Sequence, residues 1–222
     1  MKWFTLVFLT LAMLTSCSNS SEFETSEIKA IKMLRETINA RKTPTMILDV
    51  KKIVTRKKID EAKIPVLFIE LENKQNGTLT LYPGQGVGET WLGADGAIIT
   101  FNNGILKATR GMRNDLMGAT SSIPHWSQIE KSATYSRKFT YLDANNQTYS
   151  KKFACYIETD GSNSSVTIFD VDFSVQRYDE ICAGNSSKIN NVYFVDRNGL
   201  VRRSIQYHGE ALGSIIIERL ER

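Results

Sequence analysis

The stretch VTIFDVDFSVQRY, residues 166–178, gives the clearest indication of the fold. From position 169 to position 176 its residues alternate between apolar and polar. Successive side chains of a β-strand point to opposite faces of a sheet, so this alternation predicts one long antiparallel strand with one buried and one solvated face. The apolar positions are Phe169, Val171, Phe173 and Val175, and the polar positions are Asp170, Asp172, Ser174 and Gln176.

Dipeptides that favour tight turns divide much of the remaining chain into similar runs. Asn-Gly and Asp-Gly tolerate the positive φ angles of hairpin tips, and each of these dipeptides lies between β-prone segments. The pattern predicts a mainly β protein whose antiparallel, hairpin-rich sheets form a sandwich or a partly open barrel. The dipeptides are Asn76-Gly77, Asp95-Gly96, Asn103-Gly104, Asp160-Gly161 and Asn198-Gly199.

One amphipathic helix is expected before the strands. Residues 21–24, SEFE, form a capping box, and aliphatic residues recur at positions 28, 31, 34 and 38. This spacing predicts a helix over residues 22–40, which ends before Pro44.

The N-terminus resembles a bacterial lipoprotein signal. A short basic start is followed by an apolar run at residues 3–14, too short for a membrane-spanning helix, which needs about 20 residues. Residues 14–17, LTSC, resemble a lipobox. The expected organisation is a signal peptide at 1–16, a lipidated tether at 17–22 and one β-rich domain at 23–222. Cys17 would carry diacylglycerol and an acyl chain such as palmitate. The alternatives are an ordinary secretory signal with an incidental Cys17, or a buried N-terminal strand.

Two cysteines remain after lipidation, Cys155 and Cys182. An oxidising periplasm favours a disulfide between them, and the alternative is two separate buried thiols. If Asp160-Gly161 closes a two-residue hairpin, Cys155 lies opposite Val166. The bond would then join a strand to a later loop rather than two cross-strand neighbours.

Composition and motifs favour a protein without catalysis, metal or cofactor. The 222 residues are 41% hydrophobic and 23% charged, as in an ordinary globular domain, and the net charge of +4 is too small to predict nucleic-acid binding. His125 and His208 are the only histidines, and neither lies in a nucleophile motif or at zinc spacing from the cysteines. The basic tract at residues 51–58 is interpreted as a solvated strand face or linker, with acidic polysaccharide or lipid headgroups as the alternative contact.

Several motifs occur in order along the chain: WLGADG at 91–96, Asn103-Gly104, TRGMRNDL at 109–116, Cys155, EIC at 180–182, NVYFVD at 191–196, Gly199 and SIQYHG at 204–209. Together they resemble the YjbF/GfcB family of lipoproteins from group 4 capsule and exopolysaccharide operons. The chain departs from the family at Ile105, where Arg is common, and at Phe194, where Trp is common. The resemblance implies an outer-membrane lipoprotein of β-rich fold that assists assembly or export of a surface polysaccharide, with no enzyme activity.

The resulting hypothesis is a non-catalytic accessory that a lipid anchors to the outer membrane, facing the periplasm. Its partners would be the membrane and a polysaccharide or export proteins, and not nucleic acid. Trp91, Arg110 and Arg113 are the expected contact residues, because an aromatic ring and cations near hairpin ends suit sugar rings and acidic groups. The alternatives are a polysaccharide hydrolase, which needs two carboxylates in one cleft, and a purely structural envelope lipoprotein.

Overall fold

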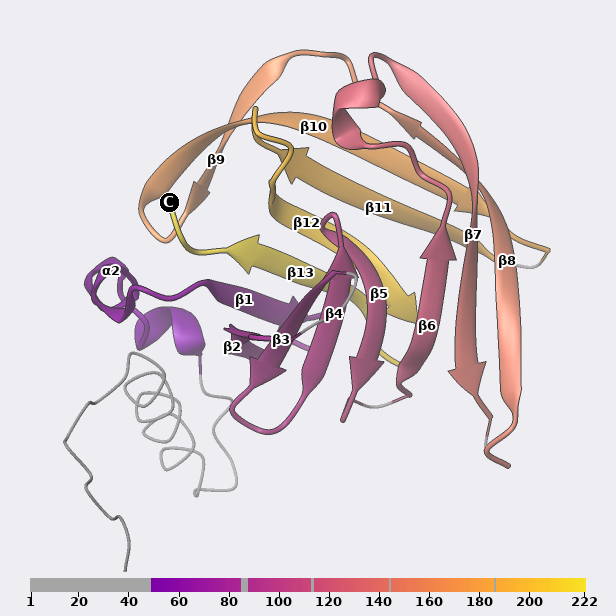
Figure 1. Cartoon of the computed structure of the whole chain (residues 1–222), viewed down its shortest axis with the longest axis horizontal. Coiled ribbons are helices and arrows are strands. Elements are labelled where there is room, and N and C mark those ends of the chain that lie inside the picture. The colour runs from indigo at the N-terminus through magenta and orange to yellow at the C-terminus, as the bar shows by residue number, and fades with distance from the viewer. Residues whose placement is uncertain (1–48, 85–87, 113, 144, 186) are drawn as a thin grey trace, which may run out of the picture.

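The computed structural model in Figure 1 describes residues 49–222 except 85–87, 113, 144 and 186. The expected signal peptide, the tether with Cys17 and the helix over 22–40 lie outside the described residues. The described elements are η2 (Val50–Lys52), α2 (Arg56–Ala62), β1 (Val66–Leu71), β2 (Asn76–Tyr82), β3 (Glu89–Gly93), β4 (Ile98–Asn102), β5 (Ile105–Arg110), β6 (Leu116–Ser121), η3 (Trp126–Gln128), β7 (Ser132–Leu142), β8 (Thr148–Glu158), β9 (Asn163–Ile168), β10 (Val171–Ala183), β11 (Lys188–Val195), β12 (Val201–Gly209) and β13 (Gly213–Arg219).

The described strands form one antiparallel sheet that is nearly closed into a barrel. The sheet order is β5-β4-β3-β2-β1-β13-β12-β11-β10-β8-β7-β6, and β9 pairs only with β10. The strands at the two ends of this order, β5 and β6, follow each other in the chain and lie side by side in Figure 1. The predicted mainly β fold is confirmed, and of the two predicted arrangements the partly open barrel is the one observed.

The stretch at residues 166–178 does not form the single strand that its alternation predicts. The chain turns back at Phe169 and Asp170, which have φ angles of 45° and 64°, so β9 and β10 form a tight hairpin. The Phe169 ring packs against Phe68 with ring centroids 5.6 Å apart, which explains how an aromatic residue occupies a turn. Val166 lies opposite Phe173, so both arms of the hairpin direct apolar side chains to the same face.

The turn predictions hold in part. Asn103-Gly104 is a hairpin tip with φ angles of 50° and 76°, and Asp95-Gly96 and Asn198-Gly199 also lie in turns. Asn76 and Gly77 instead begin β2, because the turn comes earlier, around Lys74 with its φ of 68°.

The disulfide between Cys155 and Cys182 is present, but its predicted geometry is wrong. The two residues are direct cross-strand partners on β8 and β10, with Cα atoms 4.0 Å apart. β8 pairs with β10 and not with β9. Asp160-Gly161 therefore connects two strands that do not pair with each other, and Cys155 does not lie opposite Val166.

Apolar side chains form a core inside the sheet and two further clusters. The inner core includes Trp91, Ile99 and Phe139. A second cluster joins β1 and the β9–β10 hairpin to η2 and α2. The third surrounds Trp126 of η3. The barrel interior is therefore filled by side chains, and a binding site has to lie at its edges or surface.

Candidate functional site

The two end strands of the sheet, β5 and β6, run beside each other along a line that we call the seam. At one end of the seam, side chains join the two strands. The Arg110 guanidinium donates to the carbonyl oxygens of Leu116 and Met117 at 3.1 and 3.2 Å, and the Leu116 N–H donates to Thr109 Oγ1 at 2.9 Å. Among the described residues, no backbone hydrogen bond joins β5 to β6. Side chains thus replace the ladder that would close the barrel.

The short loop between β5 and β6 is held by Asp115. Its carboxylate accepts from the backbone N–H groups of Gly111 and Met112, both at 2.9 Å. The Thr109 hydroxyl also donates to it at 3.3 Å, which ties the loop to β5.

A cleft of about 230 Å³ opens at the other end of this seam. We call it the seam cleft. Its walls are the first half of β5, the second half of β6, the β4–β5 turn and the segment that leads into η3. The lining residues are Asn102, Asn103, Ile105, Leu106, Lys107, Ala119, Thr120, Ser121, Ile123, Pro124, His125 and Trp126.

Trp126 fixes the position of the cleft walls. Its indole N–H donates to the carbonyl oxygen of Asn103 at 3.0 Å, so η3 holds the tip of the β4–β5 hairpin. The same ring packs against Tyr178 and Tyr193, with centroids 5.2 and 5.0 Å away. Trp126 therefore connects the rim of the cleft to the buried aromatic cluster and fixes the position of the rim.

The two histidines have different environments. His125 is exposed at the cleft, and its side chain caps η3 by accepting from the Ser127 N–H. His208 is fully buried, with Nε2 2.9 Å from Thr109 Oγ1, and burial lowers its pKa to about 4. His208 is therefore neutral at neutral pH and acts as a packing and hydrogen-bonding group.

A buried ionic network lies inside the sheet around Glu180. Its carboxylate accepts from Arg137 at 2.9 Å, from Tyr193 at 2.9 Å, and also from Tyr135 and Asn191. Burial, followed by the charge of Glu180, raises the pKa of both tyrosines above the ordinary value. Because the carboxylate is fully partnered and shielded from solvent, the network has the properties of a structural element.

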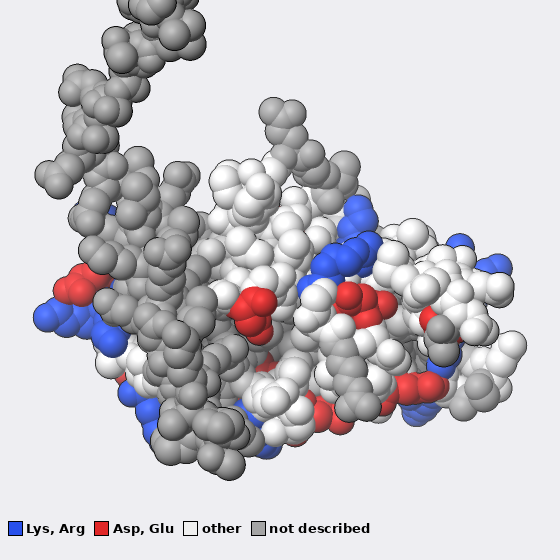
Figure 2. Space-filling model, turned by 90° about the horizontal axis from the view of Figure 1, so that it is seen from below, with Lys and Arg blue, Asp and Glu red and all other residues white. Residues whose placement is uncertain are grey.

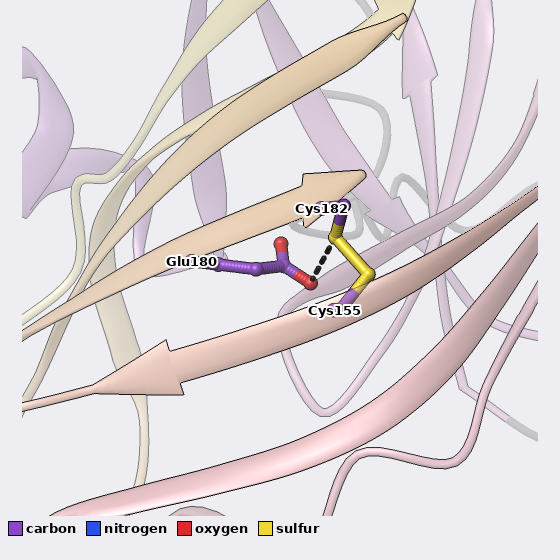
Figure 3. A group of neighbouring side chains, drawn as sticks. All are labelled: Cys155, Glu180 and Cys182. Carbon is purple, nitrogen blue, oxygen red and sulfur yellow. Dashed lines mark hydrogen bonds between the residues drawn. A yellow bond between two sulfur atoms is a disulfide. The ribbon is translucent and has the colours of Figure 1, made fainter. Parts of the chain in front are cut away.

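The disulfide lies next to this network. Figure 3 shows the Glu180 carboxylate beside Cys182, with Oε1 3.4 Å from Sγ. Cys155, Glu180 and Cys182 are close enough together to resemble a metal site. Both sulfur atoms are bonded to each other, however, and only a thiolate is a strong metal ligand.

A second cleft, of about 250 Å³, contains the carboxylates of Glu158, Asp160 and Asp179. Asp179 forms two hydrogen bonds with Arg177, at 2.8 and 2.6 Å, and Glu158 accepts from Tyr156. Hydrogen bonds from Ser162 lower the pKa of Asp160. A glycosidase needs a general acid with a raised pKa, so Asp160 does not suit that role.

The surface charges are mixed in sign. Figure 2 shows basic and acidic side chains interspersed over the described part of one face. The basic tract lies in η2 and α2 and not in the strand or linker that was expected, and its cations are paired locally, as in Arg56 with Asp60 and Lys57 with Glu61. This pairing leaves the tract a weak candidate for binding a polyanion.

The two predicted contact residues that the structure describes, Trp91 and Arg110, do not form an exposed binding site together. Trp91 is 0% exposed, because it lies at an inward position of β3 beneath the Arg219 guanidinium, so the prediction that it stacks on sugars is wrong for this structure. Arg110 is exposed but bonds across the seam. Arg113 lies outside the described residues, so its role stays a prediction.

Sequence reasoning missed the residues of the seam cleft. Asn103 was recognised only as a turn and family-motif residue, and the remaining polar lining residues were assigned no role in binding. Their common location depends on the meeting of β5 and β6, which the one-dimensional pattern does not contain.

Fold and site together define a protein with one nearly closed antiparallel sheet, a polar cleft at its open seam and a structural disulfide. A family model described as "Group 4 capsule polysaccharide lipoprotein gfcB, YjbF" matches residues 24–220, and the chain belongs to this family. The comparison with curated proteins finds no match.

The crystal structure of the hypothetical lipoprotein YmcC from Escherichia coli (K12) has a similar fold. Its TM-score is 0.71 at 18% sequence identity, covering 86% of this chain and 95% of that one. Membership in a family of lipoproteins implies a lipid-anchored location in the cell envelope. Among the described residues, no helix is long and apolar enough to span a membrane.

Proposed function

We propose that this protein is an outer-membrane lipoprotein that acts as a non-catalytic accessory in the assembly or export of a capsular or extracellular polysaccharide. The observation that carries the proposal is the match of residues 24–220 to a family whose description names capsule polysaccharide and a lipoprotein. The lipid on Cys17 would hold the β domain at the membrane, and the domain would face the periplasm, where it meets the polymer or its export proteins.

A non-catalytic role is supported by the chemistry of the two clefts. The seam cleft has no Asp or Glu among its lining residues, and glycoside hydrolysis ordinarily needs a pair of carboxylates. The second cleft, which we call the acidic cleft, has the carboxylates of Glu158, Asp160 and Asp179, but each of them accepts hydrogen bonds from neighbouring groups. These local bonds favour a structural role for the acidic cleft.

The test measures surface polysaccharide in a strain that lacks the protein. Complementation uses the wild type, Cys17→Ala, and Glu158→Gln combined with Asp179→Asn. We expect loss of polymer in the deletion, rescue by the wild type and by the carboxylate variant, and no rescue by Cys17→Ala. Normal polymer in the deletion strain would refute the pathway. Failure of the carboxylate variant alone, with its fold intact, would favour the hydrolase.

A further inference from the structure

We infer that the seam cleft binds an acidic sugar residue of the polysaccharide, with Lys107 as the partner of its carboxylate. The inference rests on the proposed function for the identity of the polymer. The evidence lies in the unused hydrogen-bonding groups of the cleft, its charge, its size and the state of the β5 edge.

The cleft holds polar side chains that no other described group uses. Within the described residues, the side chains of Asn102, Asn103, Lys107 and Thr120 have no hydrogen bond or ion pair. Asn102, Asn103 and Thr120 are exposed and Lys107 is half-buried. Amides and hydroxyls that converge on one hollow suit the many hydroxyls of a sugar ring, since they offer both donors and acceptors.

The charge of the cleft favours an acidic ligand. Lys107 contributes a cation, and the lining has no carboxylate to neutralise it. Some other lysines have such partners, as Lys74 does 3.1 Å from Glu70, and described lysines without one, such as Lys138 and Lys188, are exposed, whereas Lys107 is half-buried. A sugar carboxylate would give Lys107 a charge-assisted hydrogen bond in a partly desolvated setting.

The size of the cleft fits a small part of a long polymer. Ligand pockets for drug-sized molecules have volumes of roughly 300–1,000 Å³, and the seam cleft is smaller at about 230 Å³. It suits one sugar ring with its substituents, while the rest of the polymer stays outside. Ile123 and Pro124 add an apolar surface on which the apolar face of a ring can rest.

An edge strand can also accept a peptide, but the β5 edge is poorly suited to this. The Gln206 side chain already binds two backbone groups there, accepting from the Leu106 N–H and donating to the Gly104 carbonyl, both at 2.8 Å. The pairing of β4 with β5 is also irregular near Phe101. An added strand could therefore not form a continuous ladder of hydrogen bonds with β5, so a ligand in the cleft has to be bound by side chains.

The binding test uses the lipidated full-length protein in detergent micelles. The probe is a set of short oligomers cut from the surface polysaccharide of the producing strain, before and after reduction of their carboxyl groups to alcohols. The variants are Lys107→Gln and Lys107→Glu. Lys188→Glu is the matched control, because Lys188 is an exposed lysine on β11 outside the cleft. Urea midpoints establish that each variant is folded.

We expect Lys107→Gln to weaken oligomer binding about tenfold and Lys107→Glu to weaken it further, because each removes a charged hydrogen bond. Lys188→Glu should bind as the wild type does, and carboxyl-reduced oligomers should lose about the same factor of ten. Wild-type affinity in Lys107→Glu, equal affinity for reduced oligomers, or no binding to the wild-type protein would each overturn the inference.

Surface polymer in cells separates this inference from the proposed function. If the deletion abolishes the polymer but Lys107→Glu restores it and binds oligomers normally, the cleft assignment fails and the proposed function stands. If the deletion leaves the polymer unchanged while oligomer binding still depends on Lys107, the proposed function fails and the cleft assignment stands. If Lys107→Glu fails to restore the polymer in cells but binds oligomers as the wild type does, Lys107 contacts a partner other than the sugar, such as a polypeptide. That outcome overturns the sugar assignment.

Discussion

Replacement of Arg137 by Met tests whether the buried network around Glu180 is a structural element. The Arg137 and Glu180 side chains are each 1% exposed, so this variant leaves a carboxylate buried without its cation. Breaking such a pair costs about 3–5 kcal/mol. Because Tyr135, Tyr193 and Asn191 still donate to Glu180, we expect the lower end, about 3 kcal/mol.

Urea unfolding at pH 7 measures this loss, with every protein, the wild type included, carrying Cys17→Ala so that the proposed lipid is absent. With a urea dependence of roughly 2–3 kcal/mol per molar, a loss of about 3 kcal/mol lowers the midpoint by about 1–1.5 M. The double variant Arg137→Met, Glu180→Gln removes the unpaired charge and keeps an amide oxygen as acceptor for the neighbouring donors, so it should recover part of the loss. A single variant within about 0.5 kcal/mol of the wild type, or a double variant less stable than the single one, would refute the reasoning.

Three further predictions concern the disulfide, His208 and the seam. Replacing Cys155 and Cys182 together by Ser should cost about 3.5 kcal/mol, from the sequence separation of 27, and thermal unfolding should show the same loss on reduction of the wild type. His208 has a pKa of about 4 when folded and about 6.5 when unfolded, so the unfolded state binds more protons between these two pH values. The free energy of unfolding should therefore fall by about 3 kcal/mol as the pH drops from 6.5 to 4. His208→Gln should flatten that part of the pH profile. Arg110→Ala should lower stability by about 1.5–3 kcal/mol and speed amide hydrogen exchange in β6, while unchanged exchange there would show that Arg110 does not hold the seam.

The sequence predicted the class of the fold because alternation and turn residues are local signals. The same signals failed at residues 166–178, where two apolar arms surround a turn made of Phe169 and Asp170. That turn is stabilised by contact with Phe68, about a hundred positions earlier, and no local rule registers such a contact. The incorrect prediction that Cys155 lies opposite Val166 has the same origin, because the hairpin turn was assigned to Asp160-Gly161 instead of Phe169 and Asp170.

The candidate site was less predictable than the fold. An aromatic residue such as Trp91 suits a sugar-binding surface or a core equally well in sequence, and the face of β3 on which it lies depends on the whole sheet. Lys107 drew no attention because a single lysine in a strand has no pattern. Its relevance arises only when β6 and the segment before η3 complete the hollow around it.

The disulfide joins residues that lie directly opposite each other on β8 and β10, while β9 comes between those strands in the chain. The disulfide therefore closes a covalent loop from Cys155 to Cys182 that contains the β9–β10 hairpin. The tip of this hairpin can open without letting β8 slide along β10. A slip of one position would turn Glu180 and Cys182 outward and bring Ile181 into the core, and the bond makes this slip impossible. Oxidation in the envelope thus selects the one alignment in which the Glu180 carboxylate meets its donors.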